Sequence, residues 1–228
     1  MDITFILNNP SVPENIGAVA RAIKTMGFKK LRIVNPVDEF MSRARIIAHA
    51  SNDILENAII FKSFNKAIED FDFLIATSSK KRRTNEEYIH SNDLYKLLEN
   101  KQNHIAKSGI VFGSEESGLS NDEIKRCDII SYIPLIQSYP SLNLSHAVMV
   151  YAYLLSGFNK STIKSIEKKP EGSIKVLKEK VSVILDEIHI KQPHIIGPRI
   201  FERISMLKDE DLSLIHSICN AYLEKKRI

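Results

Sequence analysis

Short apolar runs alternate with stretches of helical periodicity over the first two thirds of the chain. Five runs, at residues 3–7, 31–34, 73–76, 110–112 and 129–134, are rich in Ile, Val, Leu and Phe and are predicted to be buried strands. Between them, apolar residues recur at the spacing of an amphipathic helix. Strands that alternate with helices predict an α/β fold, with a mainly parallel sheet covered by helices on both faces.

Two segments carry the start signals of a helix. Ser11 to Glu14 has the pattern of a capping box with proline in the first turn, and Gly27 is predicted to end the helix that follows. Ser120 to Glu123 is predicted to be a second capping box, which opens a short helix toward Cys127. The first helix is expected to bury one apolar stripe, formed by Ile16, Val19, Ala20 and Ile23.

The pattern changes near Gly157. Residues 158–172 are rich in Lys, Ser and Asn and lack periodicity, which predicts a linker. Beyond it, a helical stripe from Leu177 to Ile188 is followed by two further helices, predicted over 197–207 and 209–226. The predicted organisation is therefore an α/β domain at 1–157, a linker at 158–172, and a small helical extension at 173–228 that is too short for a large core of its own.

Composition narrows the class of protein. Hydrophobic residues make up 43% and charged residues 26% of the chain, the balance of a folded water-soluble protein, and the net charge of +4 only weakly indicates a polyanionic partner. The chain has no apolar run of membrane-spanning length and no signal-peptide pattern. Its two cysteines, Cys127 and Cys219, have no Cys-x-x-Cys spacing. We therefore expect a cytoplasmic protein with reduced thiols that does not insert into a membrane.

One glycine-rich segment resembles a nucleotide motif only superficially. Residues 113–120 follow a predicted strand, but Leu119 stands where a phosphate-binding loop has lysine, and Glu115 and Glu116 would repel a triphosphate. A strand that runs into such a turn is still a common ligand site in α/β sheets. The alternative is a turn in which the glycines serve only the backbone.

Two further segments combine polar side chains with element boundaries. Gly17 and Arg21 lie one turn apart, away from the apolar stripe, so the glycine would leave space for a phosphate or ribose beside the guanidinium; the alternative is a solvated arginine. Residues 133–145 leave a strand and enter an apolar helix through Ser141 and Asn143. These two side chains could be helix caps, or they could place a hydroxyl and an amide in a pocket.

Taken in order, these segments resemble the signature motifs of the SpoU branch of the SPOUT methyltransferases. The matching residues are Asn15-x-Gly17-x-x-x-Arg21, the Gly113 to Leu119 loop, Ser141-Leu142-Asn143, and the turn Thr77-Ser78-Ser79. Residues 139–144 and the helical tail look like the tRNA 2′-O-methyltransferases that modify the first nucleotide of the anticodon loop, a cytidine or uridine at position 32. The resemblance covers residues 1–157 and, more loosely, the tail.

The resemblance implies a fold, a reaction and a cofactor. Such proteins thread the C-terminal part of the α/β domain into a deep trefoil knot and work as homodimers, in which each subunit completes the other's site. They transfer a methyl group from S-adenosylmethionine to a ribose 2′-hydroxyl of RNA and release S-adenosylhomocysteine. The donor would lie among Thr77, Ser78, Ser79, Gly113, Ile133 and Leu142, with Gly17, Glu115 and Gly118 supporting the motif loops.

The resemblance also assigns catalytic roles to Arg21, Ser141 and Asn143. A ribose hydroxyl is a poor nucleophile at neutral pH and must lose its proton as it attacks the methyl group. Because the pKa of a guanidinium lies above about 12, Arg21 is expected to position and stabilise the acceptor rather than act as a base. Ser141 and Asn143 would bond the acceptor or hold the loop, and Glu115 would buttress the motif loops.

Basic residues suggest where RNA would bind. Lys80, Lys81, Arg82 and Arg83 directly follow the Thr77 to Ser79 turn; they are either a solvated turn or, with Asn15, contacts to RNA. Arg199 and Arg203, one turn apart in the tail, are weaker candidates. His49, His146 and His194 have no metal-ligand spacing, and the reaction needs no metal. Two alternatives stay open: another RNA target, ribosomal or in tRNA, and a non-catalytic RNA-binding protein that keeps the fold.

Overall fold

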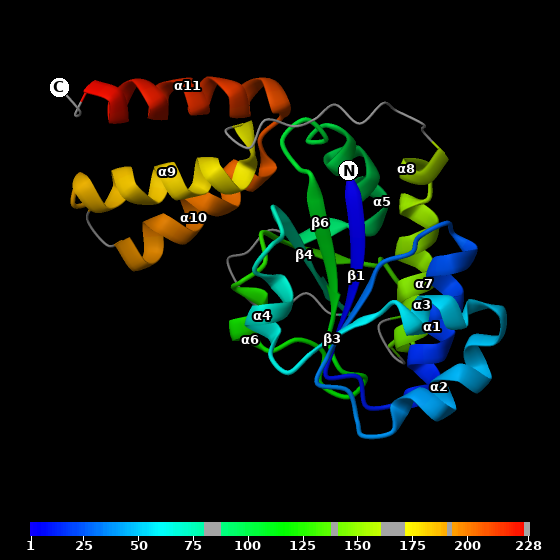
Figure 1. Cartoon of the computed structure of the whole chain (residues 1–228). Coiled ribbons are helices and arrows are strands. Elements are labelled where there is room, and N and C mark those ends of the chain that lie inside the picture. The colour runs from blue at the N-terminus through cyan, green and yellow to red at the C-terminus, as the bar shows by residue number, and fades with distance from the viewer. Residues whose placement is uncertain (80–87, 138–140, 161–171, 191–192, 226–228) are drawn as a thin grey trace. The chain divides into compact units, whose positions relative to one another are not determined.

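A computed structural model of the chain describes residues 1–79, 88–137, 141–160, 172–190 and 193–225 (Figure 1). The chain divides into two compact units, and each is considered by itself. The first comprises Met1–Tyr95 and Lys107–Ile163, and the second comprises Lys96–Ala106 and Lys164–Ile228. This division differs in one respect from the predicted one, because Lys96–Ala106 belongs with the C-terminal helices and not with the α/β domain.

The first unit is built on a seven-stranded sheet in which every pairing is parallel. The predicted parallel α/β fold is confirmed, but the sequence pattern misses both edge strands. Each of these two strands has only three residues. In β3, Ile59 and Ile60 are 53% and 51% exposed, so hydrophobic and polar residues do not alternate there as they do in a strand with one buried face. Across the sheet the strands are β3 (Ile59–Phe61), β2 (Leu31–Val34), β1 (Asp2–Asn8), β6 (Lys107–Phe112), β4 (Phe73–Ser78), β7 (Ile129–Tyr132) and β5 (Tyr88–His90).

Helices cover both faces of the sheet (Figure 1). On one face lie α1 (Pro13–Thr25), α2 (Phe40–Ala48), α3 (Asn52–Glu56) and α7 (Leu144–Leu155), and on the other α4 (Phe64–Ile68) and α6 (Asn121–Ile124). Alternate residues of β1 supply the two cores: Phe5 packs against Phe28 and Phe112, whereas Ile6 joins the cluster formed with α4 and α6. The remaining short helices of this unit are η1 (His49–Ser51), α5 (Ser91–Glu99), whose last turn passes into the second unit, and α8 (Gly157–Lys160).

The two predicted capping boxes have different outcomes. At α6, Ser120 and Glu123 form the reciprocal hydrogen bonds of a capping box, so that prediction is confirmed. At α1, the helix begins at Pro13 and ends before Gly27, which has a φ of 86°, as predicted. The predicted capping box of α1 is wrong, because Val12 is the N-cap and makes no side-chain cap bond. The hydroxyl of Ser11 donates instead to Glu115, a residue 104 positions away.

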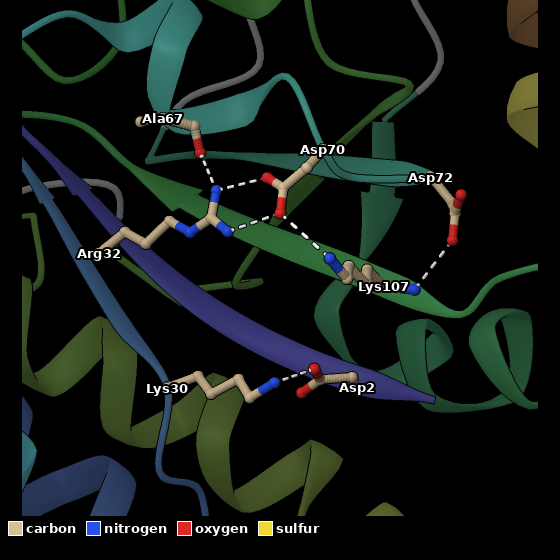
Figure 2. A network of polar contacts seen from close by, with 7 residues as sticks. All are labelled: Asp2, Lys30, Arg32, Ala67, Asp70, Asp72 and Lys107. Atoms are coloured by element: carbon tan, nitrogen blue, oxygen red, sulfur yellow. Dashed lines mark hydrogen bonds and ion pairs between the residues drawn. The ribbon is translucent and has the colours of Figure 1, made fainter. Parts of the chain in front are cut away.

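A polar network joins the amino ends of the strands (Figure 2). The Arg32 guanidinium on β2 donates to both carboxylate oxygens of Asp70, at 2.6 and 2.9 Å, and lies over the Phe71 ring. Lys107, the first residue of β6, donates to the same carboxylate at 3.2 Å. These cations hold the pKa of Asp70 well below its usual value, with the Arg32 bonds as the largest cause. Lys30 and Asp2 form a further ion pair at this edge.

The second unit is a small bundle of three helices, α9 (Ile174–Glu187), α10 (Pro193–Met206) and α11 (Asp209–Lys225). The segment Lys96–Ala106 is tied to it by polar contacts. The buried Lys101 ammonium donates to the carbonyl of Leu207, the Asn103 N–H donates to the Asp209 carboxylate at 3.3 Å, and the Ile174 N–H donates to the carbonyl of His104. These bonds explain why a segment distant in sequence belongs to this unit.

Two expectations remain predictions at the level of the fold. The first is the trefoil knot, since residues 80–87 and 138–140 lie outside the described residues. The second is the linker, because its residues 161–171 also lie outside them. Among the described residues, no helix combines the length and apolar character needed to cross a membrane.

Candidate active site

A cavity of about 460 Å³ lies at the carboxyl ends of β4, β6 and β7. In parallel α/β sheets this edge is where ligands bind. All six residues assigned to the methyl donor line it, together with Ser141, and they come from three turns that are distant in sequence. The lining residues with these assignments are Thr77, Ser78, Ser79, Gly113, Ile133, Ser141 and Leu142.

The loop after β6 closes on itself beside the cavity. Ser114 and Gly118 form an antiparallel bridge, and the hydroxyls of Ser114 and Ser117 lie 2.8 Å apart. A Cβ at position 113 would lie 2.1 Å from the backbone of Gly118, and Gly118 itself has a φ of 68°. Both glycines are therefore required by the loop's own backbone, whatever ligand the cavity holds.

Asn15 links two of the motif segments. Its amide nitrogen donates to Glu115 at 2.9 Å, and its oxygen accepts from the amide of Asn143, also at 2.9 Å. Asn143 is the N-cap of α7, where its own oxygen accepts from the N–H and hydroxyl of Ser145. The Asn15 amide therefore joins α1 to the loop after β6 and to the start of α7, and its predicted contact with RNA stays a prediction.

Glu115 holds the start of α1. Its carboxylate accepts from the N–H and hydroxyl of Ser11, at 2.8 and 2.9 Å, as well as from Asn15. Partial burial by itself would raise the pKa of Glu115, but the hydrogen bonds from Asn15 and Ser11 outweigh it, so the pKa lies below its usual value. A carboxylate with these partners and a lowered pKa is a weak proton acceptor, and its hydrogen bonds connect the loop after β6 to the start of α1.

Arg21 and Gly17 occupy α1 in different environments. Arg21 is exposed and does not line the cavity, and no side-chain partner of its guanidinium is found in the described part of the chain. Gly17 is buried, and a Cβ there would lie 2.2 Å from the carbonyl oxygen of Ala44 on α2. The expectation that Gly17 opens space for a ligand is therefore wrong, because the glycine allows two helices to approach closely.

The remaining predicted residues are basic side chains. Lys80, Lys81, Arg82 and Arg83 lie outside the described residues. Arg199 and Arg203 lie in the second unit, on α10. Among the described residues, no group of three or more His, Cys, Asp or Glu side chains is suited to hold a metal ion.

Four residues to which the motifs assign no role also line the cavity. Ala147 and Tyr151, one turn apart on α7, line it, as do Phe112 and Leu119. The Tyr151 hydroxyl donates to Ser131 at 3.0 Å, and burial raises its pKa. The signal was present in the sequence, because Ala147 and Tyr151 are four residues apart on one face of the predicted apolar helix.

Comparison with known proteins identifies the family. Residues 2–153 match the model of the SpoU rRNA Methylase family, which covers the unit that contains the cavity. The chain belongs to the SpoU methylase family. The C-terminal residues 171–226 of this SpoU methylase match a second model, the C-terminal domain of the tRNA/rRNA methyltransferase LasT. The family predicted from the motifs is therefore confirmed, and the chain is an RNA methyltransferase.

Two relatives extend the comparison of this SpoU methylase. It is 35% identical over 218 residues, 96% of both chains, to a protein of Escherichia coli named as an uncharacterized tRNA/rRNA methyltransferase, LasT. It is 41% identical over 155 residues, 66% of both chains, to the tRNA (cytidine-2′-O-)-methyltransferase TrmJ of Methanocaldococcus jannaschii.

Two solved structures share the fold of this SpoU methylase. TrmJ from Z. mobilis is 23% identical, with a TM-score of 0.67 over 97% of this chain and 99% of that one. The SpoU methyltransferase AviRb from Streptomyces viridochromogenes, solved in complex with its cofactor AdoMet, is 18% identical, with a TM-score of 0.54 over 70% of this chain and 61% of that one. At these identities the likeness concerns the fold alone.

Proposed function

We propose that the chain is an S-adenosylmethionine-dependent tRNA 2′-O-methyltransferase that acts on a cytidine or uridine at position 32 of the anticodon loop, in the cytoplasm. The observation that carries this proposal is the cavity at the carboxyl edge of the sheet, which all six residues assigned to the donor line. The name of the TrmJ relative, a tRNA (cytidine-2′-O-)-methyltransferase, supports the choice of tRNA and of the ribose hydroxyl.

The cavity fits the proposed donor in size and in chemistry. Its volume of about 460 Å³ is that of a small-molecule site. The backbone at Gly113 can approach an adenosine, and Ile133 and Leu142 offer apolar walls. Glu116 adds an exposed carboxylate, which favours a cationic sulfonium over a polyphosphate. When bound there, S-adenosylmethionine would supply an electrophilic methyl group.

The acceptor side depends on Arg21 and Ser141. The ribose hydroxyl must be held in line and must lose its proton as it reacts. Arg21 would orient the hydroxyl or a neighbouring phosphate and stabilise the developing negative charge on oxygen. Ser141, exposed at the cavity, would hydrogen-bond the acceptor. Asn143 acts as a positioning residue in this proposal, because its amide already bonds Asn15 and Ser145.

We propose further that the enzyme is a homodimer whose sites are completed across the two copies. The support is that Arg21 is exposed but does not line the cavity. A second copy could bring its Arg21 to the cavity of the first. Lys80, Lys81, Arg82 and Arg83 follow the donor turn in sequence, and we propose that they contact RNA phosphates.

The experiment that tests the proposed function is methyl transfer from labelled S-adenosylmethionine to bulk tRNA and to ribosomal RNA, followed by mass spectrometry of nucleosides and of tRNA fragments. We expect a 2′-O-methylated cytidine or uridine in tRNA, mapped to position 32. Label in ribosomal RNA alone would keep the reaction and replace the substrate by one that the family description and the name of the LasT relative both include. Binding of the donor without transfer to either RNA would contradict catalysis.

A mixing experiment tests the shared site. Ala147→Leu would fill the cavity, whereas His146→Leu, at the exposed neighbouring position, is its matched control and should stay active. Arg21→Ala should bind the donor but lose turnover. Mixed after dissociation, the inactive Ala147→Leu and Arg21→Ala chains should regain about a quarter of the activity, because half of the dimers are mixed and each mixed dimer has one intact site. If mixing restores nothing, the sites lie within single copies.

A further inference from the structure

Three adjacent strands carry a row of side chains at the carboxyl edge of the sheet. Ala76 of β4, Ile130 of β7 and Tyr88 of β5 are neighbours in the register, and they lie in or against the core that faces α4 and α6. Side chains alternate between the two faces of a strand, so the residues two positions later point to the same side. Those residues are Ser78, Tyr132 and His90, which the register again places side by side.

This row begins at the cavity proposed for the methyl donor and ends at the edge of the sheet. Ser78 lines the cavity, as does Ile133, the residue that follows Tyr132. Adjacent strands lie about 4.8 Å apart, so His90 on the edge strand β5 is about 10 Å from Ser78 along the row. Tyr132 and His90 therefore form the rim of the sheet directly beside the cavity.

The His90 and Tyr132 rings are held as a pair. Their centroids lie 4.7 Å apart at an interplanar angle of 64°, and the Tyr132 hydroxyl and Nε2 of His90 share a hydrogen bond. Tyr88 meets the Tyr132 ring edge-on, with the centroids 6.2 Å apart. His90 is exposed and Tyr132 is half-buried. Because these contacts restrict rotation of the rings, the pair offers a preorganised aromatic surface to a ligand.

The chemistry of this pair suits an unpaired RNA base. Proteins recognise single-stranded RNA by stacking its bases on rings such as those of Tyr and His, and the stacking tolerates any base because every base has a π-face. A phosphate backbone must also be able to run past the rings. Among the described residues, the strands β4, β5 and β7 carry no carboxylate that would repel it.

We propose that the His90–Tyr132 pair stacks the base of an RNA nucleotide that neighbours the methylated one. The inference rests on the proposed function, because it takes the cavity to be the place where the acceptor ribose reacts. Stacking of the neighbouring base beside the cavity holds the unpaired strand there and limits the positions open to the acceptor ribose. The pair thus contacts a base, whereas the basic residues proposed above contact phosphates.

Binding of fluorescent oligouridine to the full-length chain, followed by anisotropy, tests the proposal without requiring turnover. His90→Leu and Tyr132→Leu should each weaken binding about tenfold at low and at high salt, because stacking, unlike phosphate contact, depends little on salt. Tyr132→Phe keeps the ring and should bind within about threefold of the wild type. The matched control is Phe61→Leu, which removes a partly buried ring from the end of the opposite edge strand and should bind like the wild type.

A wild-type chain that binds no oligouridine, or leucine variants that bind it like the Phe61→Leu control, would overturn the inference. Photo-cross-linking of the wild type to oligouridine that contains 5-iodouridine avoids any effect of substitution on folding. We expect mass spectrometry to find the cross-link on His90 or Tyr132, and a cross-link confined to other residues would also overturn the inference. Methyl transfer to RNA together with any of these negative results would leave the proposed function intact. Cross-linking at the pair without methyl transfer to any RNA would contradict catalysis and keep the stacking surface.

Discussion

Asn15 shows how one side chain can connect distant parts of a site. Its amide bridges Glu115 and Asn143, which are 100 and 128 residues away. The motif pattern predicts that these segments meet, because the residues match one family signature. It does not predict which atoms bond, since an asparagine near a helix start serves equally well as a solvent-facing contact. Only the packing of α1 against the loop after β6 turns this amide inward.

The first prediction concerns the charge at this bridge. Asn15→Asp would set a carboxylate against Glu115, remove its donor and raise the pKa of Glu115. We expect the free energy of unfolding at pH 7 to fall by about 1–3 kcal/mol, and the loss to shrink as the pH drops toward 5 and one of the two carboxyls is protonated. Urea unfolding across this pH range measures the loss in the free energy of unfolding. Asn15→Ala is the neutral comparison, and its loss should change little with pH.

The second prediction concerns Asp70 at the opposite edge of the sheet. Asp70→Asn weakens the bonds to Arg32 and Lys107, and because the carboxylate is partly exposed we expect a loss of about 1 kcal/mol. The folded pKa of Asp70 lies well below its unfolded value, so this stabilisation is complete above pH about 4 and declines as the pH falls further. Wild-type and variant stabilities should therefore converge in acid. A stability difference between wild type and variant that grows at low pH would contradict the lowered pKa of Asp70.

At the scale of elements, the sequence predicts the centre of the sheet better than its edges. The inner strands are apolar because both faces of the sheet are covered, and this burial makes them readable. The capping of α1 could not be predicted, because its partner Glu115 is 104 residues from Ser11. The role of Gly17 was missed for a similar reason: a glycine required by the carbonyl of Ala44 looks, in sequence, like one that opens a binding site.

Gly17 provides the third prediction. Alanine favours a helix over glycine by about 1 kcal/mol, yet a Cβ at position 17 would lie 2.2 Å from the Ala44 oxygen. Gly17→Ala should therefore destabilise the protein by about 1–3 kcal/mol, because α2 must shift. Gly197→Ala, within α10, is a comparison in which nothing beyond the chain neighbours lies within 4 Å of the Cβ. Because Pro198 follows and disfavours a Cβ on the preceding helical residue, we expect stability to change by less than about 1 kcal/mol. Thermal unfolding of both variants measures whether the close contact with Ala44 or the higher helix propensity of alanine has the larger effect on stability at position 17.

At the scale of the molecule, the motifs predict the family and the sheet edge that carries the cavity. They do not predict that the second unit is discontinuous. Sequence continuity alone predicts that Lys96–Ala106 belongs to the α/β domain. The segment is hydrogen-bonded to the ends of the C-terminal helices. The partners of Lys101, Asn103 and His104 are Leu207, Asp209 and Gly172, the nearest of them 68 residues later in the chain.

The fourth prediction follows from this discontinuity. In a chain that ends at Ile163, the boundary of the first unit, the Asn103 N–H loses its bond to Asp209 and the Lys101 ammonium loses the carbonyl of Leu207. We expect amide hydrogen exchange to accelerate in 96–106 and to stay slow in β6, which pairs with β1 and β4. Mass spectrometry of exchanged peptides measures both. Unchanged protection in 96–106 would mean that the segment is held without the C-terminal helices.

The bond between Lys101 and Leu207 also has a consequence for the newborn chain. The two residues are 106 positions apart, and a ribosome adds roughly 5–20 residues per second. Lys101 is therefore synthesised roughly 5–20 seconds before the Leu207 carbonyl to which it bonds. During that interval the Lys101 ammonium has no Leu207 carbonyl to bond, so the second unit is completed only after most of the chain has been synthesised. The last strand of the first unit, by contrast, ends at Tyr132.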